Sequence, residues 1–157
     1  MKKYGKALLF IGGSGHARVL IESVLRDRGE IVGILDPNYP KGQIVSGIEV
    51  LGGDEVITQF DPYSIELVNG LGVLPSKLRR WEIANLYQES GYRFAKIVHP
   101  SAIISNNVVL EDGVQVMAGC VLQDGVKVGR HTVINTGTTI DHGCVIGREC
   151  WLSPGVT

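Results

Sequence analysis

The chain has 157 residues, 44% of them hydrophobic, and a formal net charge of −1 with both signs mixed along it. This length allows one ordinary domain or two small ones, and the mixed charge is unlike the basic surface that nucleic acid or an anionic membrane attracts. No apolar run reaches membrane-spanning length, and the apolar start breaks into a glycine turn, unlike a signal peptide; we therefore expect a cytoplasmic protein.

The first half alternates predicted strands and helices. Apolar runs predict buried strands at 7–11, 31–35 and 65–68. Apolar residues at helical spacing predict a helix over 16–28, and further helices are predicted from near Asp54 and from near Leu78 to before Gly91. This alternation is typical of a small parallel sheet covered by helices. We expect this α/β domain to occupy residues 1–96.

A glycine-rich loop, Gly13-Ser14-Gly15, joins the first strand to the first helix. Its backbone N–H groups would face an anion at a helix N-terminus. Asp36 follows Gly15 by 21 residues, where an acid that binds ribose is expected. The third glycine of an NAD fingerprint is replaced by Arg18, so that fingerprint is incomplete. A nucleotide site, and a tight turn without a ligand, both remain open on these residues.

The second half repeats every six residues. An aliphatic residue stands at every sixth position from Val98 to Leu152, in ten consecutive units, and a small or β-branched residue follows each of them four positions later. Six is a multiple of the strand period of two, so one position of each unit can always face inward. This predicts a hexapeptide β-helix over 97–157. Residues eighteen apart would stack on neighbouring coils about 4.8 Å apart, as in the series Val116, Ile134 and Leu152.

The repeat explains the cysteines of the second half but not some of its polar residues. The three cysteines take the small inward position, which predicts core packing. Asn135, Asp141 and His142 are polar residues of uncommon type at the turns. The neutral imidazole of His142 is a candidate general base. A solvent-exposed turn histidine without a chemical role is the alternative.

The segments "GGSGHA", "ILDP", "GIEVLGG", "VNGLG", "HPSAIIS" and "NTGTTIDHGCVIG…SPG" stand in the order found in the sugar acyltransferase family. The chain resembles this family, with its sialic acid O-acetyltransferases and its perosamine and bacillosamine-pathway N-acetyltransferases, over essentially its whole length. The resemblance implies a Rossmann-like α/β domain that holds a sugar nucleotide, followed by a left-handed parallel β-helix. It also implies a homotrimer that binds acetyl-CoA as co-substrate between subunits, without a metal.

The resemblance also implies roles for particular residues. The catalytic group is His142, with Asp141 and Asn135 beside it in the motif. The substrate-binding residues are Ser14, Gly15, His16, Asp36, Pro37, Asn69 and Gly70, and the CoA contacts are Trp151 and Gly155. Two positions depart from the family pattern. Gly143 stands where members often carry a carboxylate, and Trp151 stands near where bacillosamine-pathway enzymes place a histidine.

These observations predict an acetyltransferase that acts on an amine or hydroxyl of a sugar, linked to a nucleotide, in the synthesis of cell-surface polysaccharide. Two alternatives stay open. One is a catalytically degenerate trimeric scaffold, favoured by Gly143; the other is a nucleotide-binding oxidoreductase or sensor. Because an open coil end would leave Leu152 and Val156 uncapped, we also expect the β-helix to be incomplete at its C-terminus, with a chain that continues beyond Thr157.

Overall fold

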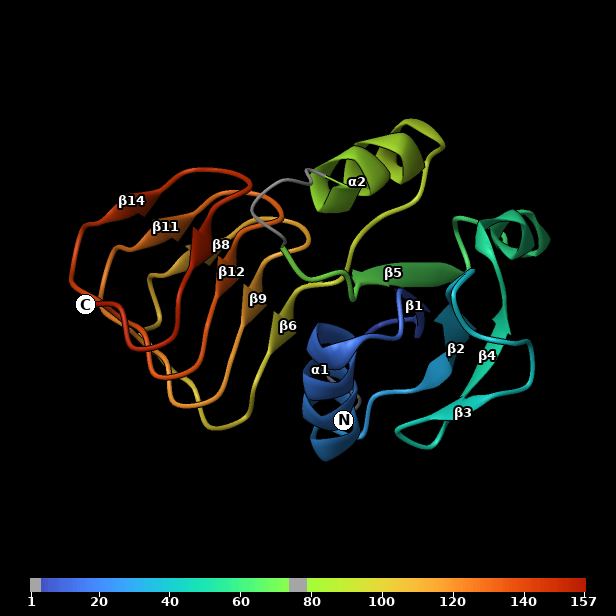
Figure 1. The fold of residues 1–157 in the computed structure, drawn as a ribbon. Coiled ribbons are helices and arrows are strands. Elements are labelled where there is room, and N and C mark those ends of the chain that lie inside the picture. Colours follow the sequence, from blue (N-terminus) through green and yellow to red (C-terminus); the bar gives the residue numbers. More distant parts are fainter. Residues whose placement is uncertain (1–3, 74–78) are drawn as a thin grey trace. The chain divides into compact units, whose positions relative to one another are not determined.

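The computed structural model describes residues 4–73 and 79–157 (Figure 1). The chain divides into two compact units, Met1–Ala95 and Lys96–Thr157. The first unit is an α/β sheet and the second is a β-helix, so the change in sequence period coincides with a change in architecture.

The first unit is built on a five-stranded sheet in the order β3-β4-β2-β1-β5. Its strands are β1 (Ala7–Ile11), β2 (Ile31–Leu35), β3 (Ile44–Val45), β4 (Ile48–Gly52) and β5 (Ile65–Asn69). β1 lies next to the edge strand β5 and pairs in parallel with β2 on one side and β5 on the other. The chain therefore reverses direction across the sheet at β1, which is the topology that opens a crevice at the carboxyl ends of the strands.

The described part of the first unit has three helical segments beside the sheet: α1 (Gly15–Arg26), the 3₁₀ helix η1 (Asp54–Gln59) and α2 (Arg79–Glu89). The strands predicted at 7–11 and 31–35 are confirmed with the same bounds, and the first predicted helix is confirmed as α1. The helix start predicted near Leu78 lies outside the described residues. The strands β3 and β4 were not predicted; they form a hairpin at the edge of the sheet, closed by Ser46 and Gly47, which both have positive φ angles.

Each face of the sheet buries apolar side chains. On one face, β1, β2 and β5 pack with η1 and α2 around a cluster of buried residues: Leu9, Ile11, Leu35, Ile57, Ile65, Leu67, Ala84, Tyr87, Tyr92 and Phe94. α1 contributes Ala17, Leu20, Ile21 and Val24, which recur at helical spacing and are fully buried. This spacing gives the helix one apolar stripe. The core therefore holds β1, β2 and α1 in place, and with them the loop that joins β1 to α1.

The second unit is a left-handed parallel β-helix with three flat faces (Figure 1). The first face holds β7 (Ile103–Ile104), β10 (Val121–Leu122) and β13 (Thr139–Ile140). The second face holds β8 (Val109–Leu110), β11 (Lys127–Val128) and β14 (Val145–Ile146). The third face holds β6 (Ile97–Val98), β9 (Gln115–Val116), β12 (Val133–Ile134) and β15 (Trp151–Leu152).

The coils stack in the register that the repeat predicts. Ile134 pairs with Val116 on one side and with Leu152 on the other, which confirms the predicted inward stack. The buried Thr132 and Thr138 donate their hydroxyls to backbone carbonyls of Gly147 and Ser153 on the next coil. Inward polar side chains are thus satisfied by hydrogen bonds between coils, as a buried position requires.

The cysteines differ in burial although they share one position of the repeat. Cys120 is buried, and its thiol donates to the backbone carbonyl of Asn135 at 3.0 Å. Cys144 is exposed and Cys150 is intermediate. Both stand on the last coil of their faces, where no further coil of the described chain covers them. The expected core packing is confirmed for Cys120, whereas Cys144 is exposed.

From residue 113 onward, one position in each unit turns the chain at a corner with a positive φ. Residues 113, 119, 125, 137, 143 and 155 are glycines with φ between 67° and 73°. His131 and Glu149 take the same position with φ of 58°. Positive φ is costly for residues with a Cβ, so these two corners are locally less favourable than the glycine corners.

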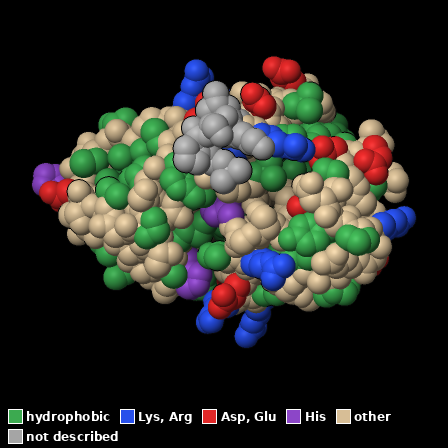
Figure 2. All heavy atoms as spheres, viewed as in Figure 1, with side chains coloured by type: hydrophobic (Ala, Val, Ile, Leu, Met, Phe, Trp, Pro, Cys, Tyr) green, Lys and Arg blue, Asp and Glu red, His purple; other side chains and the backbone are tan. Residues whose placement is uncertain are grey.

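The surface carries both signs of charge, and Figure 2 shows Lys and Arg side chains interspersed with Asp and Glu over the face in view. Among the described residues, no helix has the length and apolar character needed to cross a membrane.

Candidate functional site

The first candidate site is a cavity at the carboxyl ends of β1 and β2. Its volume is about 370 Å³. It is lined by Ile11, Gly12, Ser14, Leu35, Asp36, Pro37, Asn38, Asp54, Leu71, Gly72, Val73, Arg79 and Ile83. Of the residues predicted to bind the substrate, Ser14, Asp36 and Pro37 line this cavity. Gly15, His16, Asn69 and Gly70 are not part of its described wall.

Asp36 organises the glycine-rich loop. Its Oδ2 accepts a hydrogen bond of 2.8 Å from the backbone N–H of Gly13. Its Oδ1 accepts bonds from the backbone N–H and the side-chain amide of Asn38, at 2.9 and 3.0 Å. The buried carboxylate therefore ties the end of β2 to the loop after β1. Because Asn38 donates with its amide nitrogen, its Oδ1 is oriented as the remaining acceptor of that side chain.

Gly70 explains how the loops after β1 and β5 approach each other. A Cβ added to Gly70 would lie 2.6 Å from the backbone oxygen of Gly12 and 2.7 Å from the Cβ of Ala17. In dinucleotide-binding folds the third glycine of the fingerprint allows helix and strand to pack closely. Here Gly70 and Ala17 provide that close packing, so Arg18 does not prevent it.

Asn69 is buried at the end of β5 and joins this strand to α2. Its side-chain amide donates to the backbone oxygen of Arg80 at 2.9 Å, and its Oδ1 accepts from the N–H of Leu71 at 3.2 Å. The guanidinium of Arg80 donates in turn to the backbone oxygens of Asn69 and Leu71. Burial lowers the pKa of Arg80 to about 9, so the group is still charged at neutral pH. Asn69 thus lies behind the cavity wall and holds Leu71 and the start of α2 in place.

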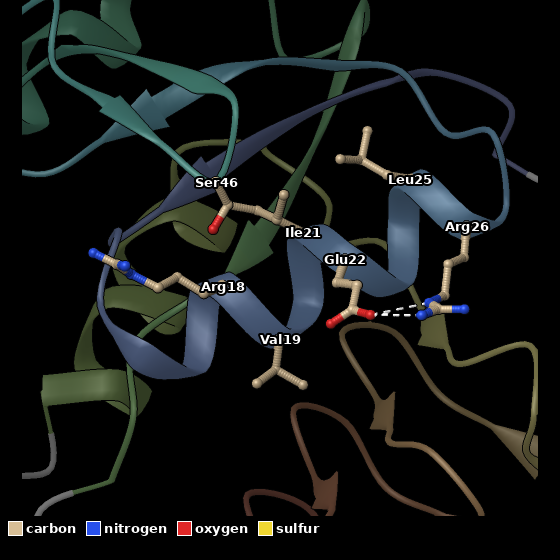
Figure 3. Close-up of a pocket in the computed structure, with 7 residues that line it drawn as sticks. All are labelled: Arg18, Val19, Ile21, Glu22, Leu25, Arg26 and Ser46. Atoms are coloured by element: carbon tan, nitrogen blue, oxygen red, sulfur yellow. Dashed lines mark hydrogen bonds and ion pairs between the residues drawn. The ribbon is translucent and has the colours of Figure 1, made fainter.

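A larger hollow of about 650 Å³ lies along α1 and beside Ser46 (Figure 3). Its labelled side chains do not converge on one point, and the exposed Val19 and Leu25 belong to it. Arg26 and Glu22 pair with each other there at 2.8 Å. This hollow borders the length of α1, whereas ligands of such folds bind at the carboxyl ends of the strands. The smaller cavity is therefore the better candidate for a nucleotide.

The second candidate site is the corner between the first and second faces of the β-helix. It comprises Asp141 to Cys144 and contains His142, whose side chain is exposed. The backbone N–H of His142 donates to Oδ1 of Asp141 at 2.8 Å. Gly143 has a φ of 70°, and its N–H donates to the backbone oxygen of Asp124 on the preceding coil at 2.9 Å. The corner thus presents the imidazole to solvent from a backbone that hydrogen bonds hold on both sides.

Other predicted residues of this unit lie at different corners. Asn135 follows β12 at the corner between the third and first faces, and both its backbone N–H and its side-chain amide donate to the oxygen of Leu152. Trp151 lies on the third face, and Gly155 lies at the Asn135 corner, with its N–H bonded to the oxygen of Thr136. Within one chain, none of these three residues meets His142.

Three residues of the cavity wall with polar side chains were not among the predicted substrate-binding residues: Asn38, Asp54 and Arg79. Asn38 had a local signal, because an Asp-Pro-Asn segment favours a turn in which side chains bond to the backbone. Asp54 and Arg79 had none, since charged residues at helix starts are ordinary on solvated surfaces. Only the packing of η1 and α2 at the end of the sheet brings them to the cavity.

Two family models match the chain. The PglD N-terminal domain matches residues 7–87, and the bacterial transferase hexapeptide (six repeats) matches residues 107–142. No curated protein sequence matches significantly.

Solved structures resemble nearly the whole chain. Perosamine N-acetyltransferase from Caulobacter crescentus, solved as a histidine-to-asparagine mutant with CoA and GDP-perosamine, is 30% identical, with a TM-score of 0.85 over 96% of this chain and 70% of that chain. The acetyltransferase domain of PglB from Neisseria gonorrhoeae FA1090, solved with acetyl coenzyme A, is 27% identical, with a TM-score of 0.84 over 97% of this chain and 72% of that chain. The chain therefore belongs to the sugar acyltransferases that join a PglD N-terminal domain to a hexapeptide-repeat β-helix.

Proposed function

We propose that this protein transfers an acetyl group from acetyl-CoA to an amine or hydroxyl of a sugar linked to a nucleotide. The sugar nucleophile attacks the thioester carbonyl, and the imidazole of His142 takes the proton that the nucleophile loses. The C–S bond then breaks and CoA leaves as its thiol, with the proton returned by the imidazolium. General base catalysis of this kind contributes about 10²–10⁴-fold to the rate.

The observation that carries this proposal is the likeness, over both units together, to N-acetyltransferases solved with CoA, acetyl-CoA or GDP-perosamine. The perosamine enzyme was solved with a single histidine replaced by asparagine or by alanine. The imidazole of His142 is exposed on a corner held by hydrogen bonds, which supports the role of general base that we propose for it. Because the reaction uses direct attack, it needs no nucleophilic cysteine, and the burial of Cys120 is compatible with it.

The acceptor would occupy the cavity of the first unit. Ser14, Asp36 and Pro37 would face it, while Gly15, His16, Asn69 and Gly70 would shape the loops around it. A cavity of about 370 Å³ suits the nucleotide part of such a ligand. Its position at the carboxyl ends of parallel strands is the usual one for nucleotides in α/β folds.

We propose that the active form is a homotrimer with the active sites between subunits. Asn135, Trp151 and Gly155 lie away from His142 within one chain, so a second chain is needed to complete a site that contains them all. The outward residues Ile103 on the first face and Val145 on the second are 66% and 73% exposed, and Val109 on the second face is also exposed. Val133, which takes the same position of the repeat on the third face, is buried. Exposed apolar faces of this kind mark protein interfaces.

We place the reaction in the cytoplasm, where acetyl-CoA and nucleotide sugars are available.

A second candidate is a trimeric scaffold without catalytic activity, which Gly143 favours because no carboxylate follows the histidine. An oxidoreductase or sensor, the other alternative, requires a dinucleotide in the cavity. One experiment separates all three. The full chain is incubated with acetyl-CoA and a panel of GDP- and UDP-linked amino sugars, and the release of CoA thiol is followed together with the mass of the sugar.

Thiol release that depends on one acceptor and matches its acetylation supports the transferase. Binding of acetyl-CoA and sugar nucleotide without any turnover supports the scaffold. Tight binding of NADH without binding of acetyl-CoA supports the oxidoreductase, and either of these last results overturns the proposal.

A further inference from the structure

The wall of the nucleotide cavity has an unusual charge balance. Within the described residues it carries two carboxylates, Asp36 and Asp54, and one cationic side chain, Arg79. A nucleotide diphosphate brings further negative charge to this wall. Resting on the proposed function, we propose that the guanidinium of Arg79 binds a phosphate group of the nucleotide diphosphate and is the main electrostatic determinant of its affinity.

Arg79 is available for this role. Its Nη2 lies 3.8 Å from Oδ2 of Asp54, and the two side chains are 56% and 43% exposed. An ion pair at that separation and exposure contributes little to stability. A phosphate entering the cavity can therefore replace Asp54 as the partner of Arg79 at small cost. The planar guanidinium then offers two parallel N–H donors to two phosphate oxygens.

The neighbouring arginine keeps Arg79 at the cavity. Arg80 is 1% exposed, and its guanidinium donates to the backbone oxygens of Asn69 and Leu71. Asn69 returns a hydrogen bond from its side chain to the backbone oxygen of Arg80. These bonds attach the first turn of α2 to the loop after β5. The backbone of Arg79 is held at the cavity in consequence, while its side chain remains able to move.

Neither carboxylate of the wall can bind a phosphate in place of Arg79. Asp36 accepts three hydrogen bonds from Gly13 and Asn38 and serves the loop itself. Asp54 carries the same sign of charge as a phosphate and cannot bind one. Ser14, the N-cap of α1, also lines the cavity and makes no side-chain capping bond. The positive end of the helix dipole therefore borders the same space, and a diphosphate in the cavity meets favourable charge from the start of α1 as well as from Arg79.

The test compares a diphosphate with the matching nucleoside. Calorimetry on the full chain measures the affinity of GDP, UDP, guanosine and uridine for the parent protein and for Arg79→Gln, Arg79→Lys and Arg26→Gln. Arg26 is a matched control, because it is an exposed helix arginine paired with the carboxylate of Glu22. Thermal melting of each variant checks that it is folded.

We expect Arg79→Gln to weaken binding of the preferred diphosphate by about tenfold to a hundredfold, as the loss of a charge-assisted pair predicts. Binding of the nucleoside should change less than about twofold, because the nucleoside has no phosphate. Arg79→Lys should fall between the two, and Arg26→Gln should bind as the parent does.

Equal loss of nucleoside and diphosphate affinity in Arg79→Gln, or no loss of either, overturns the inference while leaving the proposed function intact. A parent protein that binds neither diphosphate overturns the nucleotide site and the inference with it. The parent and variant results therefore distinguish failure of the inference alone from failure of the proposed function.

Discussion

The carboxylate of Asp141 accepts a hydrogen bond from the backbone N–H of His142 at 2.8 Å. The side chain next to the candidate base therefore serves the corner of the β-helix, and no hydrogen bond among the described residues joins it to the imidazole. This relationship separates two roles that a neighbouring carboxylate can have, holding the backbone and stabilising charge on the ring. The two roles can be tested individually.

Replacing His142 by alanine should lower kcat by about 10²–10⁴-fold, the usual contribution of a general base. The affinity for the sugar nucleotide should change little, because the cavity proposed for the nucleotide is formed by residues of the other unit. Steady-state kinetics with separate measurement of nucleotide binding checks this. His99→Ala is the control, since His99 bonds to Ser101 directly after β6, and this variant should leave kcat unchanged. Full activity in His142→Ala would sink the catalytic assignment.

Asp141→Asn should retain activity, because the amide oxygen of asparagine can still accept the bond from the N–H of His142. Asp141→Ala should lower kcat and cost about 1 kcal/mol of unfolding free energy through the lost hydrogen bond. Comparing the kcat values and denaturation midpoints of the two variants shows whether activity depends on the hydrogen bond that Asp141 accepts or on its negative charge. A loss of activity in Asp141→Asn as large as in Asp141→Ala would show that the charge matters.

Gly143→Glu restores a carboxylate after the candidate base. The added Cβ meets nothing within 4 Å, but the φ of 70° is unfavourable for a residue with a side chain, with an expected cost of about 1 kcal/mol. Glu149 tolerates the same corner conformation, so the variant should fold. A carboxylate there would stabilise the imidazolium that forms in the reaction, and kcat near neutral pH should rise.

Gly143→Gln is the matched control, because it carries the same backbone strain without the charge. We expect the glutamate variant to be faster than the glutamine variant, with a difference that narrows at high pH as the acceptor amine loses its own proton. Equal rates in the two variants would show that a neighbouring carboxylate does not limit this enzyme.

Arg80→Ala should destabilise the first unit. The change leaves the backbone oxygens of Asn69 and Leu71 without their donor and opens a cavity, with an expected loss of about 3 kcal/mol of unfolding free energy. Arg79→Gln, at the exposed neighbouring position, should change this free energy by less than about 0.5 kcal/mol. Urea denaturation of the pair measures both values. Equal stability of the two variants would contradict the role given to Arg80.

Val145→Asp should dissociate the proposed trimer. Val145 is 73% exposed on the second face of a single chain, so the substitution should not disturb the coil itself, whereas a charge within a subunit interface is costly. Sedimentation velocity at micromolar concentration should show trimers for the parent and smaller species for the variant. Val19→Asp, at an apolar residue on α1 that is 47% exposed, is the control. A parent protein that sediments as a stable monomer would contradict the trimer.

The β-helix could be predicted closely from the sequence because its structure is local and periodic. Each unit uses the same aliphatic position and the same corner position, so the stack of Val116, Ile134 and Leu152 follows from counting residues. The hairpin of β3 and β4 was missed, although Ser46-Gly47 between apolar residues is a hairpin signal. Its first strand, β3, has two residues and lies at the sheet edge, where little burial enforces a clear alternation.

The sequence by itself determined the period of the second half, the strands β1 and β2, the helix α1 and the family resemblance that singles out His142. Only the tertiary structure decided which residues share a cavity and which do not. Asp54 and Arg79 line one cavity with Asp36 because η1 and α2 pack against the same face of the sheet, and Asn69 is buried where it exchanges hydrogen bonds with Arg80. Such neighbours are far apart in the chain, and no local propensity encodes a contact that depends on how separate elements pack.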